Sequence, residues 1–442
     1  MREVSRSQLE HHVSTYAQVS VESAVREASP VRVLTITPFY PSLRNEVNGC
    51  FVQESLMQLE ALGFQCPVFA VNSVYHRAET PIPRSPAQWI RYFPFPGKLG
   101  LASSGWFLGN ASVARVEGLH RRSAIDLIHA HSALPCGHAA ARISERLGIP
   151  FVVTVHGLDV FNACGQTGFT AARRRKASKR VYERASCIIC ISEKIHRILR
   201  NGMPTAVRSR VVYNGADPVI FSPARRIGDA GGVPKPRIVT VGNLSTQKGQ
   251  ELVIRAISHL IPSFPDLQCD IVGDGFARAR LKEVTRSLGL SSHVRFLGRK
   301  SRSEVAQAMR ECTVFVLPSR YEGLGCVYLE AMACEKPVIG CAKQGIDEII
   351  EHGRNGWLIS GEDVPELVQV LRTALTDTAL CTQVGKAARQ TVLGNFTWTH
   401  QARKLLDVYR EVTRHWSALG LRDSTKEDHS SRLRYLNSPG AG

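Results

Sequence analysis

Short apolar runs alternate with segments of helical periodicity along almost the whole chain. This alternation is typical of parallel sheets that are covered by helices. In the first half of the chain, the apolar runs predict strands at 31–37, 66–71, 126–131, 150–156, 187–192 and 210–214. A second series begins with RIVTVGN at 237–243 and continues through CDIVGDG, VRFLGR, TVFVLP and KPVIG. We therefore expect an α/β protein with two doubly wound domains.

A stretch rich in proline, glycine and charged residues separates the two series. Residues 223–236 show no periodicity and are predicted to be a linker. The 442 residues are too many for one ordinary core and suit two domains of about 200 residues each. We expect an N-terminal domain at 31–222, a C-terminal domain at 237–395 and a long amphipathic helix at 396–418. The polar ends, 1–30 and 419–442, are expected to be disordered.

The twelve cysteines are scattered without paired spacing. Cys187 and Cys190 form a C-x-x-C, but they lie in the apolar run CIICIS, so we expect core cysteines in a reducing compartment. No apolar run approaches the roughly 18 residues that span a bilayer. The first thirty residues also lack the apolar core of a signal peptide. These features predict a cytoplasmic protein.

The formal net charge of +18 is compatible with an anionic partner. The densest basic run consists of Arg173, Arg174, Arg175, Lys176, Lys179 and Arg180. Three interpretations stay open: a solvated helix face, docking on the anionic lipid of the inner membrane face, or nucleic-acid binding. Because no aromatic residue interleaves the run, we expect no nucleic-acid partner.

Two carboxylates, Glu322 and Glu330, lie within the most informative stretch of the chain, CTVFVLPSRYEGLGCVYLEAMACEKPVIG at 312–340. The middle of this stretch is too apolar for a solvent-facing helix and is expected to be buried on both sides. Glu330 lies within it, where a carboxylate is costly unless a partner satisfies it. Glu322 follows the first strand directly, where open parallel sheets bind their ligands. The sequence therefore predicts that both carboxylates converge on one crevice.

Three further residues stand out: His156 ends a predicted strand, and Gly49 and Lys248 lie just ahead of predicted helices. Each also has an ordinary structural interpretation. Gly49 would form a plain turn, His156 would make a structural hydrogen bond and Lys248 would be a solvated charge. Together with the Glu322 loop they mark the carboxyl ends of strands in both domains, as in a cleft between facing sheets. The P-loop, the full G-x-G-x-x-G, the Asp-x-Asp metal motif and G-x-S-x-G are all absent.

The string P-S-x-x-E-G-x-G-x-V-x-L-E-A-M-A-C-x-x-P-V-I, which begins at Pro318, closely resembles the retaining glycosyltransferases of family 4. The likeness extends to V-G-N-L-x-x-x-K-G at Val241, H-G-x-D at His156 and Y-N-G-x-D-x-x-x-F-x-P at Tyr213, and it covers roughly residues 31–418. The resemblance implies the GT-B fold, in which two Rossmann-like domains face each other across a cleft. It also implies that the final helix crosses back onto the N-terminal domain.

The resemblance assigns roles to residues of this chain. Glu322 corresponds to the glutamate that contacts hydroxyls of the donor sugar, and Glu330 to the one that holds the ribose hydroxyls. Lys248 corresponds to the lysine that binds the diphosphate. The remaining matches are the amide loop of Gly323, Leu324 and Gly325, the N-terminal phosphate loop at Gly49, and His156 near the C6 hydroxyl of the sugar.

Two departures from the family pattern concern the phosphate and the sugar. Asn243 stands where the family has an arginine, and Arg320 is the predicted replacement for the missing charge. The usual G-G-x-P-E loop is replaced by residues 343–348.

The resemblance implies an enzyme that moves a hexosyl group from a nucleotide sugar, a UDP- or GDP-sugar, to a glycan or lipid-linked glycan. It implies retention of anomeric configuration, with neither a metal nor another cofactor. The alternatives are a sugar-nucleotide epimerase or hydrolase of the same fold, and a non-catalytic sugar-nucleotide-binding protein. The acceptor cannot be read from the sequence.

Overall fold

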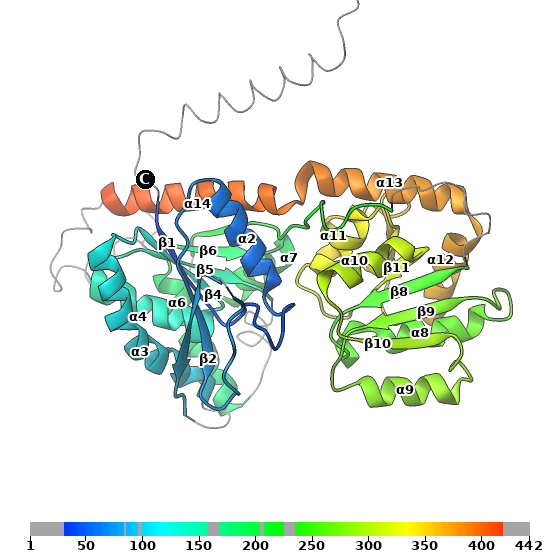
Figure 1. Ribbon diagram of the computed structural model, residues 1–442, viewed down its shortest axis with the longest axis horizontal. Helices are drawn as coiled ribbons and strands as arrows, with labels where there is room; N and C mark the ends of the chain where they lie inside the picture. The colour runs from blue at the N-terminus through cyan, green and yellow to red at the C-terminus, as the bar shows by residue number, and fades with distance from the viewer. Residues whose placement is uncertain are drawn as a thin grey trace, which may run out of the picture.

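The computed structural model describes residues 31–83, 85–95, 100–157, 168–203, 207–224 and 235–418. The two predicted disordered ends and most of the predicted linker therefore lie outside the described residues. The described chain forms two α/β units side by side, one coloured blue to green and the other green to orange in Figure 1.

The N-terminal unit is built on a seven-stranded parallel sheet in the order β3-β2-β1-β4-β5-β6-β7. Its strands are β1 (Val33–Thr37), β2 (Val68–Ser73), β3 (Ala87–Tyr92), β4 (Leu127–His131), β5 (Phe151–Val155), β6 (Cys187–Cys190) and β7 (Ser209–Val211). Its helices are α2 (Cys50–Ala61), α3 (Gly100–Arg122), α4 (His138–Leu147), α6 (Phe169–Arg184) and α7 (Glu193–Gly202). The strand order reverses between β1 and β4, as in doubly wound sheets.

The C-terminal unit is built on a six-stranded parallel sheet in the order β10-β9-β8-β11-β12-β13. Its strands are β8 (Arg237–Val241), β9 (Gln268–Val272), β10 (Val294–Gly298), β11 (Val314–Val316), β12 (Val338–Cys341) and β13 (Trp357–Ile359). Its helices are α8 (Gln250–Leu260), α9 (Arg278–Ser287), α10 (Arg302–Glu311), α11 (Cys326–Ala333), α12 (Val364–Thr376) and α13 (Thr378–Asn395). This order reverses between β8 and β11, so both sheets have the predicted doubly wound topology.

The sequence analysis missed one edge strand in each sheet, β3 and β13. In β3 two of the six residues, Ala87 and Ile90, are buried, and β13 has only three residues, so neither shows the continuous apolar run of a central strand. The prediction for α11 is confirmed: Tyr328 to Ala333 are all buried. Both cysteines of the C-x-x-C are buried in β6.

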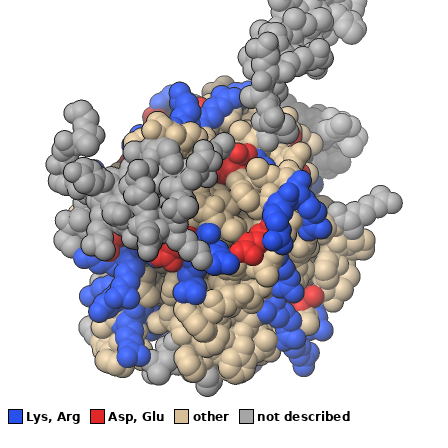
Figure 2. Space-filling view, turned by 90° about the vertical axis from the view of Figure 1, so that its left-hand side faces the viewer, with Lys and Arg blue, Asp and Glu red and all other residues tan. Residues whose placement is uncertain are grey.

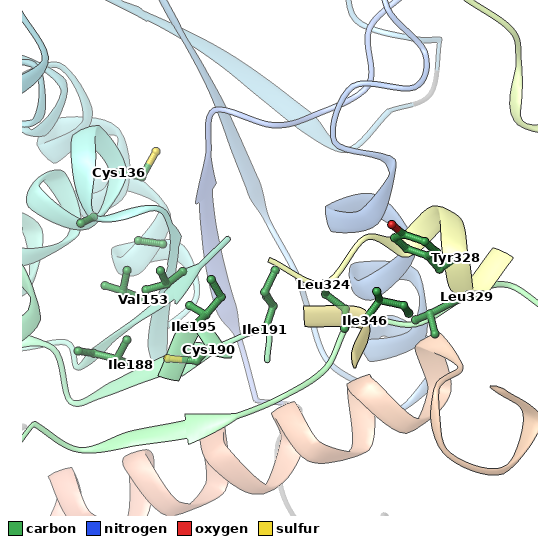
Figure 3. Close-up of a cluster of buried hydrophobic side chains, with 14 of the residues drawn as sticks. Cys136, Val153, Ile188, Cys190, Ile191, Ile195, Leu324, Tyr328, Leu329 and Ile346 are labelled. Atoms are coloured by element: carbon green, nitrogen blue, oxygen red, sulfur yellow. The ribbon is translucent and has the colours of Figure 1, made fainter. Parts of the chain in front are cut away.

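An apolar contact joins the two units. Ile191 directly follows β6, and Ile195 lies in the first turn of α7. Both lie beside Leu324 and Ile346 of the C-terminal unit (Figure 3). All four side chains are almost fully buried. The Ser192 hydroxyl donates to the Gly323 carbonyl over 2.7 Å, in the middle of this contact. The units therefore share one continuous core at the point where the Glu322 loop meets the N-terminal sheet.

The last helix, α14 (Trp398–Ala418), leaves the C-terminal unit and runs along the N-terminal one, where it packs against α2 (Figure 1). Its buried residues recur at helical spacing: Trp398, Ala402, Leu405, Val408, Tyr409, Val412 and Trp416. At its far end the Trp416 indole donates to the Gly148 carbonyl over 2.9 Å. Within the described ranges, no helix is long and apolar enough to cross a membrane.

Candidate active site

A cavity of about 510 Å³ lies between the two sheets and is called the donor cavity below. The loops that follow β1, β8, β9, β10 and β11 line it, so it opens at the reversal points of both sheets. Six predicted site residues are among its lining residues: Gly49, Asn243, Lys248, Glu322, Gly325 and Glu330. The predicted crevice with two carboxylates is therefore present.

Lys248 and Glu322 form an ion pair across the donor cavity. Lys248 ends a short 3₁₀ turn, and the next residue, Gly249, has a φ of +73°. A Cβ on Gly249 would lie 2.1 Å from the Pro318 carbonyl oxygen, so a glycine is needed to bring the lysine to the end of β11. The Gln344 side chain accepts a hydrogen bond from the Glu322 amide over 3.0 Å and fixes the loop from the other side.

Glu330 has a partner that the sequence analysis missed, Arg302 at the start of α10. The Arg302 guanidinium lies 3.1 Å from the Glu330 carboxylate and 2.5 Å from that of Glu54 in α2. It also stacks on the Phe221 ring, with 5.0 Å to the ring centroid. Arg302 therefore satisfies the buried Glu330 and ties the N-terminal unit to the C-terminal one.

One guanidinium cannot neutralise two buried carboxylates. Burial, opposed by the charge of Arg302, raises the pKa of Glu54 to about 7. Burial also raises the pKa of Glu330, again against Arg302. No sequence motif marks Arg302 or Glu54, and their contact depends on how α10 and α2 meet across the cleft.

Two helix N-termini open on the donor cavity, those of α2 and α11. Gly49 and Gly325 are their N-cap residues, both line the cavity, and neither helix has a side-chain cap. A Cβ on Gly49 would lie 2.2 Å from the Phe39 carbonyl carbon, which explains the glycine. Uncapped helix N-termini attract anions, so this pair favours a negatively charged group between the two units.

The predicted role of Arg320 is not supported by its position. Its side chain is 55% exposed, pairs with Glu362 over 2.7 Å and is not among the residues that line the donor cavity. Three other cations do line the cavity, Arg299, Lys300 and Arg302, which follow β10. These three cations were not predicted, because they lie 56 to 59 residues after Asn243, the position where the family arginine is absent.

His156 lies next to the donor cavity but does not line it. Its Nε2 is 2.9 Å from Nδ1 of His131, and its ring packs 5.0 Å from that of Phe51, which lines the cavity. His129 continues the row and lies 2.6 Å from the Tyr409 hydroxyl. Burial lowers the pKa of His156 to about 4, so its imidazole is neutral at pH 7.

The two remaining predicted residues, Gly323 and Leu324, serve the contact between the units. The Gly323 carbonyl accepts from Ser192, and the Leu324 side chain is fully buried in the shared core. Of the predicted amide loop, Gly325 alone lines the donor cavity. Among the described residues, no group of three or more His, Cys, Asp or Glu side chains is placed to hold a metal ion.

Comparison with known proteins identifies the class. Residues 51–219 match the model described as Glycosyltransferase Family 4, and residues 231–391 match Glycosyl transferases group 1. An uncharacterized glycosyltransferase of Methanocaldococcus jannaschii is 31% identical over 65% of this chain and 76% of its own length.

Two solved structures share the fold. Sucrose-phosphate synthase from Thermosynechococcus elongatus is similar with a TM-score of 0.73 and 23% identity, over 87% of this chain and 100% of the other. Anabaena HepE, solved with UDP and glucose, is similar with a TM-score of 0.68 and 21% identity, over 86% and 99%.

The two facing doubly wound units and the cavity between them define a glycosyltransferase of the GT-B fold. The matches in both halves of the chain then place it in glycosyltransferase family 4, to which this protein belongs. The predicted family, fold and enzyme class are thereby confirmed.

Proposed function

We propose that the protein transfers a hexosyl group from a nucleoside-diphosphate sugar to a glycan or lipid-linked glycan, with retention of configuration and without a metal. The observation that carries this proposal is the donor cavity, where Lys248, two glutamates and two uncapped helix N-termini meet. Such a set suits a ligand with an anionic centre and hydroxyl groups at both ends.

The diphosphate lies between the N-termini of α2 and α11, and Lys248 binds it. As the bond to the sugar breaks, negative charge develops on the diphosphate, and fixed cations and amide dipoles stabilise it without reorganising. Glu322 is then released from its ion pair with Lys248 and accepts hydrogen bonds from sugar hydroxyls. The acceptor oxygen bonds to the anomeric carbon from the face that the diphosphate leaves, which retains the anomeric configuration. The hydroxyl proton passes to the departing diphosphate.

Glu330 accepts hydrogen bonds from the ribose hydroxyls, next to Arg302. Asn243 leaves the phosphate region with one cation fewer than the family pattern, and the cations after β10 compensate. His156 belongs to the sugar end of the donor, because its neutral ring packs on Phe51 in the cavity wall. A UDP-sugar is the first donor to test, because the similar Anabaena structure was solved with UDP.

We further propose a cytoplasmic location at the inner membrane face, with α6 against anionic lipid. The exposed basic residues of α6 and the net charge of +18 support this proposal. Figure 2 views the end of the molecule that carries α3 and α4, and Lys and Arg gather on it in several bands.

A thermal-shift screen against UDP-, GDP- and ADP-sugars tests donor binding. A ligand at 100 times its dissociation constant stabilises a protein by about 2.7 kcal/mol, so a true donor gives a clear rise in Tm. Product analysis with that donor and a glycan acceptor then distinguishes the functions. A new glycoside of unchanged anomeric configuration supports the proposal, whereas free sugar or an epimer supports the hydrolase or epimerase alternative.

Addition of a chelator tests metal independence. We expect transfer to continue at an unchanged rate in EDTA, because Lys248 and the two helix N-termini supply the charge stabilisation. A strict requirement for a divalent ion would contradict this part of the proposal, and donor binding without any transfer would favour the non-catalytic alternative.

A further inference from the structure

A second cavity, of about 640 Å³, lies within the N-terminal unit between α3, α4 and α6. It is called the basic cavity below. It is lined by Phe95, Ala102, Ser103, His138, Ala141, Arg173, Lys176, Ala177, Arg180, Val181 and Arg184. None of these residues lines the donor cavity, so the two cavities are separate.

One wall of the basic cavity carries four cations and no carboxylate. Arg173, Lys176, Arg180 and Arg184 line it from one stripe of α6. Arg184 pairs with Glu145 over 2.6 Å. Among the described residues, no Asp or Glu forms an ion pair with Arg173, Lys176 or Arg180, although Lys179 on another face of α6 pairs with Glu183. Uncompensated cations on a concave wall favour an anionic ligand.

Apart from Ser103 and His138, the other described residues that line the basic cavity are apolar. Ala177 and Val181 lie between the cations on α6, and Ala102 and Ala141 face them from α3 and α4. Exposed aromatic side chains lie on the same elements: Phe93 and Phe95 after β3, Trp106 on α3, and Phe169 at the start of α6. The Phe169 ring is 69% exposed and stacks under the Arg173 guanidinium, 4.7 Å from its centroid. Basic and aromatic side chains together are typical of surfaces at a membrane interface.

One buried polar atom in the wall has no partner within the described chain. His138 lines the cavity at the start of α4, and its Nδ1 is buried without a hydrogen bond. Burial and the neighbouring Arg142 and Arg184 lower its pKa, so the ring is neutral at pH 7.

The basic cavity lies where α3 and α4 begin, at the carboxyl-end edge of the N-terminal sheet. The first turns of α3 and α4 line it, and these helices follow β3 and β4, whose carboxyl ends point toward the C-terminal unit. We propose that the basic cavity binds the phosphate group of a phosphorylated lipid, with the lipid chain along the aromatic side chains. We infer that this lipid carries the glycan acceptor, an inference that rests on the proposed transferase function.

Vesicle flotation tests the proposal with the full chain. Two kinds of phosphatidylcholine vesicle are compared, one with about 5 mol% of a polyprenyl phosphate and one with about 10 mol% phosphatidylglycerol. A phosphomonoester carries a charge of roughly −1.5 to −2, so these amounts give the two vesicles a similar surface charge. Lys176→Gln with Arg180→Gln removes two cations from the cavity. The matched control, Arg175→Gln with Lys179→Gln, removes the same charge from α6 outside the cavity.

We expect the wild type and the control to float with the polyprenyl phosphate vesicles and to bind phosphatidylglycerol less. The cavity variant loses about tenfold or more in partition to polyprenyl phosphate, because its direct charged contacts to the phosphate are lost. Equal loss in both double variants, or equal binding to both vesicle types, overturns the specific site in favour of diffuse membrane attraction. The rise in Tm with a nucleotide sugar measures donor binding independently of vesicle binding. Failure of the transferase proposal is therefore distinguishable from failure of the lipid site.

Discussion

The two cavities of this protein balance their charges in opposite ways. In the donor cavity Lys248 pairs with Glu322, and Arg302 pairs with Glu54 and Glu330. Among the described residues that line the basic cavity, none is acidic, and one of the four α6 cations has an ion-pair partner. A bound donor therefore replaces ion pairs that the protein already makes in the donor cavity. An anion bound in the basic cavity would instead neutralise cations that have no acidic partner among the described residues. The predictions below test this difference, from the largest expected effect to the smallest.

Loss of the phosphate cation gives the largest effect. Lys248→Ala removes the side chain that meets the developing charge, and one such contact contributes about 10²- to 10³-fold in kcat. The measurement is the transfer rate with saturating donor. Lys386→Ala, an exposed lysine on α13, is the control and is expected to keep full activity. Wild-type turnover in Lys248→Ala would remove the lysine from the mechanism.

Loss of the shared guanidinium strongly destabilises the fold. Arg302→Met leaves two buried carboxylates without a cation, and breaking such a network costs about 3–5 kcal/mol. We expect a smaller loss at pH 5 than at pH 8, because both carboxylates can then be neutral. Denaturant titration at the two pH values measures this. Arg299→Met, on an exposed side chain of the same cavity, is the control; an equal loss in both variants would contradict the special role of Arg302.

Glu54 makes the stability depend on pH. Its pKa is about 7 in the folded protein and 4.5 ordinarily, so the folded state binds this proton more tightly than the unfolded chain. The stabilisation is complete below pH 4.5 and is lost as the pH rises through 7. In Glu54→Gln we expect a flatter profile of unfolding free energy between these values. A profile that matches the wild type would show that Glu54 keeps an ordinary pKa.

The smallest expected effect is a difference in how added salt changes binding at the two cavities. Vesicle binding depends on exposed cations, so it should weaken steeply between low and physiological ionic strength, where the Debye length falls to about 8 Å. Donor binding should change little, because its ion pairs are largely buried. Parallel titrations of vesicles and of UDP at several salt concentrations compare the two. Equal salt dependence would contradict the proposed difference.

The donor side was largely predictable from sequence because its residues follow strands. Glu322, Lys248 and Gly49 reach the cavity through loops after β11, β8 and β1, and such loops converge at the reversal points of a parallel sheet. The position of Arg302 was not predictable, because it depends on how two separate helices meet across the cleft. Arg320 was misplaced since adjacent loop residues point in different directions, and sequence spacing does not reveal which one faces the cavity.

The basic run of α6 was visible in the sequence, but the cavity was not predicted. The spacing of the cations on α6 follows from helical periodicity, whereas the facing wall comes from α3 and α4, which end more than twenty residues before α6 begins. The row of His129, His131 and His156 was missed for a similar reason, since β4 and β5 bring it together only through their register, His131 beside Thr154. Tertiary contacts of this kind leave no local signal.

The central claim is that the donor cavity binds a nucleoside diphosphate through Lys248. Calorimetric titration of UDP, GDP and ADP into the wild type and Lys248→Ala tests it most directly. We predict that one of the three nucleotides binds the wild type and binds Lys248→Ala at least about tenfold more weakly, as expected when a charged contact to a phosphate is lost. Binding of none of the three to the wild type, or equal affinity for both proteins, would contradict the claim.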